Sequence, residues 1–171
     1  MPSLDHQNAF RFLPRGAMSK AGAASAASAQ AEQLGNLPEW NLSDLYAGMD
    51  APELVRDLAK VAAEAVAFEN EWKGKLADEA AQPNTGNLGR ALRRYEELGE
   101  LMGRIGSYAG LLYTGDTADP VRAKFYGDVQ EKLTDASAHV LFFTLELNRI
   151  DDALIDAAMD ADPGFGHYRP W

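Results

Sequence analysis

The three histidines are the residues of this chain best suited to bind a metal or to move a proton. They are His6, His139 and His167, and they lie far apart in the sequence. Asp135 precedes His139 by one helical turn, so these two side chains are close enough to form a pair of ligands. Functional zinc sites use three or four ligands. We therefore interpret His139 as a helix-surface histidine beside an acid.

Two patterns that would carry catalysis are missing from the sequence. No H-E-x-x-H zinc motif occurs, and there is no cysteine to act as a thiolate ligand or nucleophile. No Ser–His–Asp arrangement has support beyond the presence of those residue types. We therefore predict that no catalytic, cofactor-binding or metal-binding residue lies in these 171 residues.

Neighbouring acidic residues raise a different possibility, two carboxylates that share a proton. Glu96-Glu97 and Asp151-Asp152 are adjacent, and adjacent side chains on a helix point about 100° apart, so neither pair forms such a dyad. We interpret Asp151 as a helix cap. Glu146 stands inside an apolar run and leaves two interpretations open: it faces solvent, or it pairs with a cation from protein beyond this chain.

Binding to nucleic acid or to an anionic membrane is disfavoured by the charge. The chain carries a net charge of −10, whereas both partners attract a basic surface. Tyr108, Tyr113 and Tyr126 are expected to be exposed, but no basic residues interleave with them as in a base-stacking surface. The segment GDTADP has one glycine and no lysine, so it is not a phosphate loop. No run of 18 apolar residues occurs, so we expect no transmembrane helix.

Apolar periodicity predicts an all-α fold, a bundle of long antiparallel helices over about 52–72, 88–113 and 120–149. A short fourth helix begins after Asp151, and LADEAAQPNTGN between the first two helices is expected to be a loop. Each long helix has one apolar face. The residues are Leu54, Leu58, Val61, Ala65, Phe68 and Trp72; Leu88, Leu92, Tyr95, Leu98, Met102, Ile105, Ala109 and Leu112; and Phe125, Val129, Leu133, Ala136, Val140, Phe143, Leu147 and Ile150.

The expected helix ends rest on capping residues. Asp50, Asn87 and Asp119 are the predicted N-caps, and proline follows closely after the first and third. Gly74 and Gly115 are the predicted stops. The short connection after Gly115 predicts a hairpin of the second and third helices.

Four glycines form an unusual second stripe on the middle helix. Gly99, Gly103, Gly106 and Gly110 follow steps of four, three and four, and each costs about 1 kcal/mol relative to alanine. We expect the close approach of another helix to offset this cost; a deliberately bendable helix is the alternative.

The end of the third long helix is apolar on nearly every side. A helix of this kind is buried all round, and the two other long helices cover only about half of it. We therefore expect a docking surface for further protein at these residues: Val140, Leu141, Phe142, Phe143 and Leu145.

Residues 1–36 differ from the remainder in composition. They include AGAASAASAQA, which holds too little apolar surface to offset the entropy of ordering, so we predict a disordered tail followed by a helical domain over 37–171. Met18 is a plausible alternative start. The aromatic ending ADPGFGHYRPW leads us to interpret Trp171 as a cut point.

The chain resembles the N-terminal helical region of the oligoendopeptidase F family, zinc peptidases of the thimet-oligopeptidase clan, in four segments: LPEWNLSDLYAGMD, GRIGSYAGLLY, RAKFYGDVQEKL and LFFTLELNRIDD. The likeness runs from about Leu37 to the end and is densest over 95–171. In that family these helices form one wall of a deep cleft that admits short peptides. The family's zinc ligands, two His and a Glu of H-E-x-x-H plus a further Glu, have no matching positions here.

The resemblance therefore implies the non-catalytic front portion of a cytoplasmic zinc metalloendopeptidase. Zinc would belong to the full-length protein, short peptides would be its substrates, and the downstream catalytic domain would be this segment's partner. The alternative is a stand-alone helical-bundle interaction module without enzymatic activity. An in-frame continuation containing H-E-x-x-H discriminates the two.

Overall fold

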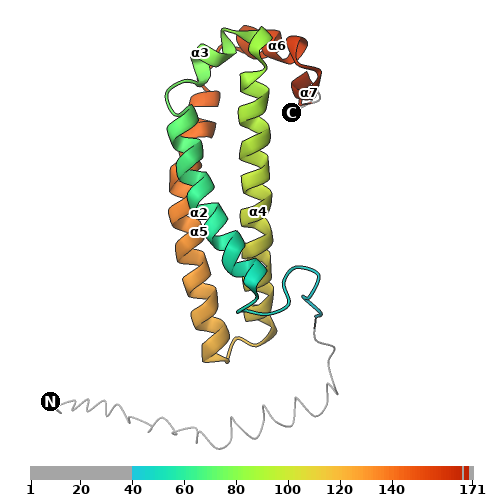
Figure 1. Ribbon diagram of the computed structural model, residues 1–171, viewed down its shortest axis with the longest axis vertical. Coiled ribbons are helices and arrows are strands. Elements are labelled where there is room, and N and C mark those ends of the chain that lie inside the picture. The colour runs from blue at the N-terminus through green and yellow to red at the C-terminus, as the bar shows by residue number, and fades with distance from the viewer. Residues whose placement is uncertain (1–39, 167, 170–171) are drawn as a thin grey trace, which may run out of the picture. The chain divides into compact units, whose positions relative to one another are not determined.

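The computed structural model describes residues 40–166 and 168–169 as an all-helical body (Figure 1). No strand occurs in this part of the chain, which confirms the all-α prediction. The predicted tail over 1–36 lies outside the described residues. The elements are α2 (Pro52–Trp72), α3 (Leu76–Ala80), the 3₁₀ helix η1 (Pro83–Thr85), α4 (Asn87–Gly115), α5 (Pro120–Leu147), α6 (Asp152–Ala161) and α7 (Pro163–Gly166).

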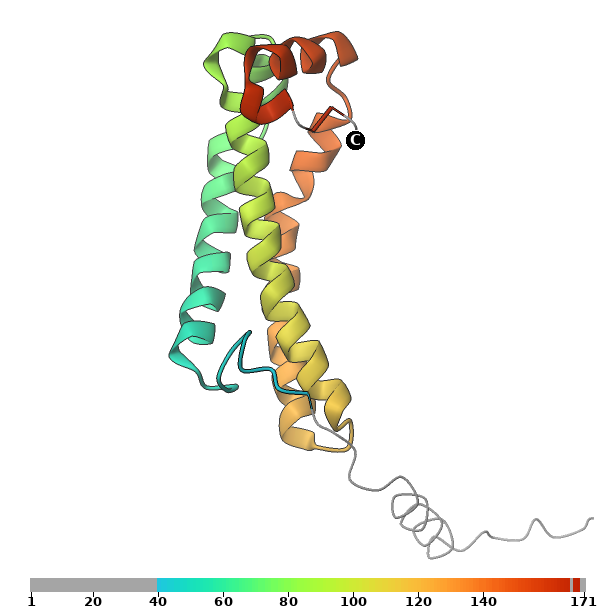
Figure 2. The ribbon, with the colours of Figure 1, turned by 90° about the vertical axis from the view of Figure 1, so that its right-hand side faces the viewer.

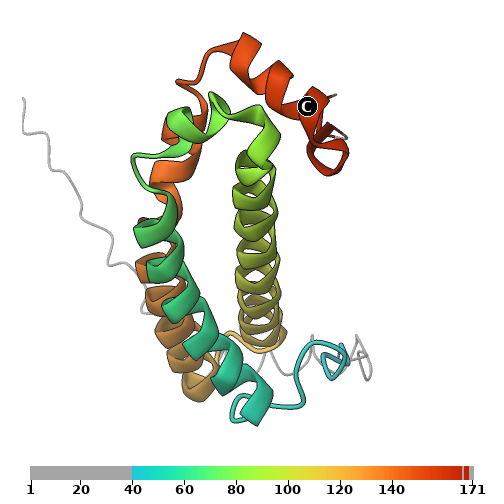
Figure 3. The same cartoon turned by 45° about the horizontal axis from the view of Figure 1, so that its top comes forward.

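Three long helices build the body. Helix α4 runs opposite to α2 and α5, and α2 and α5 run in the same direction beside each other (Figures 1 and 2). The predicted antiparallel hairpin is α4 followed by α5. Helix α6 lies across the end of the body where α4 begins, next to α3 (Figure 3).

Capping residues and glycines in the sequence correctly predicted several of the helix ends. The Asp119 carboxylate accepts hydrogen bonds from the amides of Val121 and Arg122, and Asp151 accepts one from Ala153, so both predicted caps are confirmed. Gly74 follows α2 with a φ of 77°, in the left-handed region that glycine adopts without strain.

Two predicted caps were wrong. Ala51, not Asp50, precedes α2, and no side chain caps this helix. Asn87 is the first residue of α4 itself, preceded by Gly86 with a φ of 67°. The Asn87 side chain donates a hydrogen bond to Glu79 instead, 2.7 Å away. The segment 76–87 also contains α3 and η1, where the composition predicted only a loop.

The predicted apolar faces meet in one core. Phe68 of α2, Tyr95 of α4 and Phe143 of α5 pack ring to ring, with centroids 5.4 Å apart for Phe68–Phe143 and 4.6 Å for Tyr95–Phe143. Burying a side chain of this size contributes about 1.5–3 kcal/mol. The cluster therefore holds all three long helices together near the α3 end.

The end of α5 is better covered by its own chain than the sequence indicated. Val140, Phe142 and Phe143 are buried, and Phe142 lies with its ring centroid 5.7 Å from that of Phe68. Leu141 and Leu145 are 60% and 51% exposed. Of the five residues in the predicted docking surface, only these two leucines are exposed.

No neighbouring backbone packs closely against the glycine stripe of α4. A Cβ on Gly99 or Gly103 would meet nothing within 4 Å, and one on Gly106 would make an ordinary contact with Leu133 at 3.4 Å. The close-packing prediction was therefore wrong for Gly99 and Gly103. Close approach occurs at Gly89, where a Cβ would lie 3.0 Å from that of Phe165.

No helix in the described residues combines the length and the apolar character that crossing a bilayer requires.

Candidate functional site

His139 finds its acidic partner on another helix. Its Nδ1 lies 2.6 Å from a carboxylate oxygen of Glu69 on α2, rather than beside Asp135 on its own helix. Glu69 also accepts from Lys73 at 2.5 Å. The hydrogen bonds from His139 and Lys73 lower the pKa of Glu69. His139 thus belongs to a cluster of polar side chains between α2 and α5.

His6 and His167 lie outside the described residues. Within the described ranges, no three His, Cys, Asp or Glu side chains are grouped to hold a metal ion.

Glu146 takes a role that neither sequence-based interpretation contained. Both of its carboxylate oxygens accept from the backbone amide of Gly74, at 2.9 and 3.0 Å. A charged acceptor on a backbone donor makes a strong hydrogen bond. Glu146 therefore ties the turn after α2 to the end of α5.

The most elaborate polar site surrounds Asp57. This aspartate is 4% exposed although it carries a charge, and it stands on the apolar face of α2. Its carboxylate accepts from the Tyr46 hydroxyl at 3.0 Å and from the Arg104 guanidinium of α4. Arg56 adds a longer contact of 3.3 Å. A buried carboxylate needs partners of this kind to remain ionised.

Competing effects set the electrostatics of the site. Burial raises the pKa of Asp57, but the Tyr46 hydrogen bond and the Arg104 charge outweigh burial and leave that pKa below its ordinary value. Burial and the hydrogen bond to Asp57 raise the pKa of Tyr46. The stable state is an ionised aspartate facing a neutral phenol and a guanidinium.

Tyr46 belongs to an irregular segment, residues 40–50, that we call the strap. The edge of its ring meets Tyr108 of α4 at a centroid distance of 5.3 Å and an interplanar angle of 76°. The Arg104 guanidinium lies over the Tyr46 ring, 5.3 Å from its centroid. Tyr108 is itself buried, so the expectation that it is exposed was wrong. Tyr113 and Tyr126 are half-buried and stack on each other.

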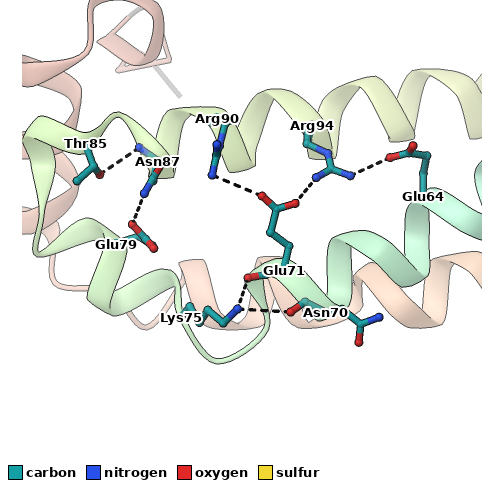
Figure 4. Close-up of polar contacts among 9 residues, drawn as sticks. All are labelled: Glu64, Asn70, Glu71, Lys75, Glu79, Thr85, Asn87, Arg90 and Arg94. Carbon is teal, nitrogen blue, oxygen red and sulfur yellow. Dashed lines mark hydrogen bonds and ion pairs between the residues drawn. The ribbon is translucent and has the colours of Figure 1, made fainter.

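A ladder of ion pairs continues from this site along α2 and α4 (Figure 4). Arg94 of α4 bridges Glu64, at 2.8 Å, and Glu71, and Arg90 reaches the other oxygen of Glu71 at 3.4 Å. Adjacent carboxylates raise the pKa of Arg94 against the opposing effect of burial.

A pocket of about 460 Å³ opens between α2 and α4 next to Arg104. Charged side chains of both signs and two leucines line it. The lining residues are Lys60, Glu64, Arg94, Glu97, Leu98, Glu100, Leu101 and Arg104.

Sequence reasoning missed Asp57, Tyr46 and Arg104 as a group. One signal was available: Asp57 lies within the apolar stripe of the first helix, three residues after Leu54 and four before Val61. A charge at such a position needs a buried partner. The identity of that partner depended on the path of the strap, which periodicity does not determine.

No family model, curated protein or solved structure matches the chain.

Proposed function

We propose that the helical body is the N-terminal, non-catalytic portion of a zinc-dependent oligoendopeptidase that hydrolyses short peptides. In this proposal it forms one wall of the substrate cleft, and the zinc and its ligands belong to a downstream domain. The absence of cysteine fits a cytoplasmic location.

The observation that carries the proposal is the way in which the family-like segments meet. Tyr46 comes from LPEWNLSDLYAGMD, Arg104 and Tyr108 from GRIGSYAGLLY, and Phe125 from RAKFYGDVQEKL. Tyr46 packs on Tyr108, which in turn packs on Phe125 with centroids 6.1 Å apart. Three of the four segments that resemble the family therefore meet in one local core. This convergence supports a common structural unit.

The proposed partner is the downstream catalytic domain. Leu141 and Leu145 are one turn apart on α5, and both are about half exposed. We assign them as the apolar contacts of this partner. Because Val140, Phe142 and Phe143 are buried by α5's own neighbours, the contact is smaller than the sequence predicted.

A stand-alone interaction module is the second candidate function. The burial of Val140, Phe142 and Phe143 favours this candidate, because the three long helices bury these side chains without further protein.

The reading frame beyond Trp171 tests the first proposal. An in-frame H-E-x-x-H, in a protein that hydrolyses short peptides and stops doing so when zinc is chelated, would support it. A stop codon directly after Trp171, or a continuation without zinc ligands, would favour the interaction module.

A further inference from the structure

The pocket between α2 and α4 lies between two ion-pair bridges that join these helices. Towards the start of α2, Arg104 pairs with Asp57, and towards its end Arg94 pairs with Glu64 at 2.8 Å (Figure 4). Both cations are on α4 and both acids are on α2. The two bridges therefore hold the helices at fixed positions on either side of the pocket.

The stretch between the bridges carries charges that the structure leaves unpaired. Lys60 of α2 and two glutamates of α4, Glu97 and Glu100, line the pocket and are exposed. Among the described residues, none forms a hydrogen bond or an ion pair with any of these three side chains. One ammonium group on α2 and two carboxylates on α4 are therefore available to a molecule in the pocket.

Two leucines supply the apolar part of the same pocket. Leu98 is 5% exposed and Leu101 is half-buried. The pocket volume of about 460 Å³ lies within the range of small-molecule sites. Such sites combine apolar surface with a few polar groups that orient the ligand. The pocket thus has the size and both kinds of lining that a small amphipathic ligand requires.

We propose that this pocket binds a small zwitterion with an apolar side chain, the chemistry of an apolar amino acid. Its ammonium group donates to Glu97 and Glu100, and its carboxylate accepts from Lys60, all through charge-assisted hydrogen bonds. Its side chain covers Leu98 and Leu101. The two ends of a short peptide offer the same groups, so the test includes both sources. This inference does not depend on the peptidase proposal.

The charges of the lining disfavour ligands of a single sign. An anion would meet the carboxylates of Glu97 and Glu100, and a diamine would bring its second ammonium group to Lys60. The guanidiniums at the two ends of the pocket already face carboxylates of α2. A ligand with one charge of each sign is the simplest one that matches all three unpaired side chains.

The experiment titrates the full chain with leucine, isoamylamine and isocaproate, followed by the NMR signals of the backbone amides. The three probes share one apolar tail, but isoamylamine lacks the carboxylate and isocaproate lacks the ammonium group. Leucine should shift the amides of residues 60 and 97–101 with a dissociation constant on the order of 1 mM. Each of the other two probes should bind at least about threefold more weakly. Leucylleucine places the same charges farther apart, and tighter binding of it than of leucine would identify a peptide as the source.

Variants of the lining test which charge binds which end. Lys60→Gln should weaken leucine about three- to tenfold and leave isoamylamine unchanged. The double substitution Glu97→Gln and Glu100→Gln should weaken leucine similarly without weakening isocaproate. All three side chains are exposed and unpaired, so these variants should fold. Glu131→Gln and Lys132→Gln, at exposed positions of α5, are the controls and should leave all affinities unchanged.

The outcomes that contradict the site are equally specific. Equal affinity for leucine and either singly charged probe would overturn the proposal, because one charge would then suffice. Leucine binding that neither Lys60→Gln nor the double glutamate variant weakens would do the same. The absence of a saturable shift at residues 60 and 97–101 with leucine and with leucylleucine would also overturn it.

Discussion

At the scale of single residues, the buried charge of Asp57 organises the polar chemistry of this protein. One carboxylate joins the strap, α2 and α4 through Tyr46 and Arg104. A carboxylate in this position stabilises the fold only while it is ionised, because a protonated acid gives up the ion pair with Arg104. The pH dependence of stability is therefore a direct measure of this site.

Replacing Asp57 by Asn should destabilise the protein by about 1–3 kcal/mol at pH 7. The folded pKa of Asp57 lies below its ordinary value of 3.8. The stabilisation is thus fully present above that ordinary value and is lost as the pH falls through the folded pKa. Urea unfolding of both proteins from pH 7 to pH 2 should show the difference shrinking on acidification.

Asp128→Asn serves as the control for this measurement. Asp128 pairs with Lys124 on the solvent side of α5 and is 53% exposed in its side chain. An exposed pair of this kind contributes little, so this variant should stay within about 0.5 kcal/mol of the wild type. A stability difference for Asp57→Asn that is constant with pH would contradict the role given to its charge.

At the scale of the elements, prediction from sequence succeeded where the signal is local. The first and third helices were placed within about two residues, because Pro52, Asp119 and Pro120 act through the backbone beside them. Prediction from sequence failed where the structure depends on which residues pack against a given face of a helix. The spacing of Gly99 and Gly103 is visible in the sequence, but the empty space beside them is not.

Two glycines of α4, one beside open space and one in close contact with other residues, test the effect of packing. Gly103→Ala should stabilise the protein by up to about 1 kcal/mol, since its Cβ meets nothing and alanine favours the helix. Gly89→Ala should destabilise it instead, because the new Cβ would lie 3.0 Å from the Phe165 Cβ and 2.5 Å from an Asp162 oxygen.

Urea unfolding of the two glycine variants under one set of conditions makes this comparison. Opposite signs are the expected result. A loss of stability in Gly103→Ala would mean that α4 has a neighbour on this face in solution, and would restore the close-packing interpretation.

At the scale of the whole molecule, the helical body is self-contained around its aromatic core yet exposes two leucines on α5. Phe68, Phe142 and Phe143 need no further protein to be buried. Leu141 and Leu145 are the apolar groups left over at the same end. The buried aromatic core is sufficient to stabilise the fold. Leu141 and Leu145 are the residues whose exposed surface a bound partner would cover.

The double substitution Leu141→Glu and Leu145→Glu separates folding from docking. Stability should change by less than about 1 kcal/mol, because both side chains are already exposed. Binding to the proposed downstream domain, supplied in trans and measured by calorimetry, should weaken at least about tenfold. Val66→Glu, at a 42% exposed position of α2, is the control and should leave binding unchanged. Unaltered binding by the double variant would remove these leucines from the interface.

The purified protein should neither hold stoichiometric zinc nor hydrolyse short peptides. His139 is engaged with Glu69, and the described residues group no three side chains able to ligate a metal ion. A peptidase of the proposed kind needs a metal to acidify water and polarise the scissile carbonyl. Metal analysis after dialysis against zinc, with a peptide-cleavage assay on the same sample, makes the measurement, and His139→Ala should give identical values. One zinc per chain together with peptide cleavage, both lost in His139→Ala, would overturn the assignment of catalysis to a downstream domain.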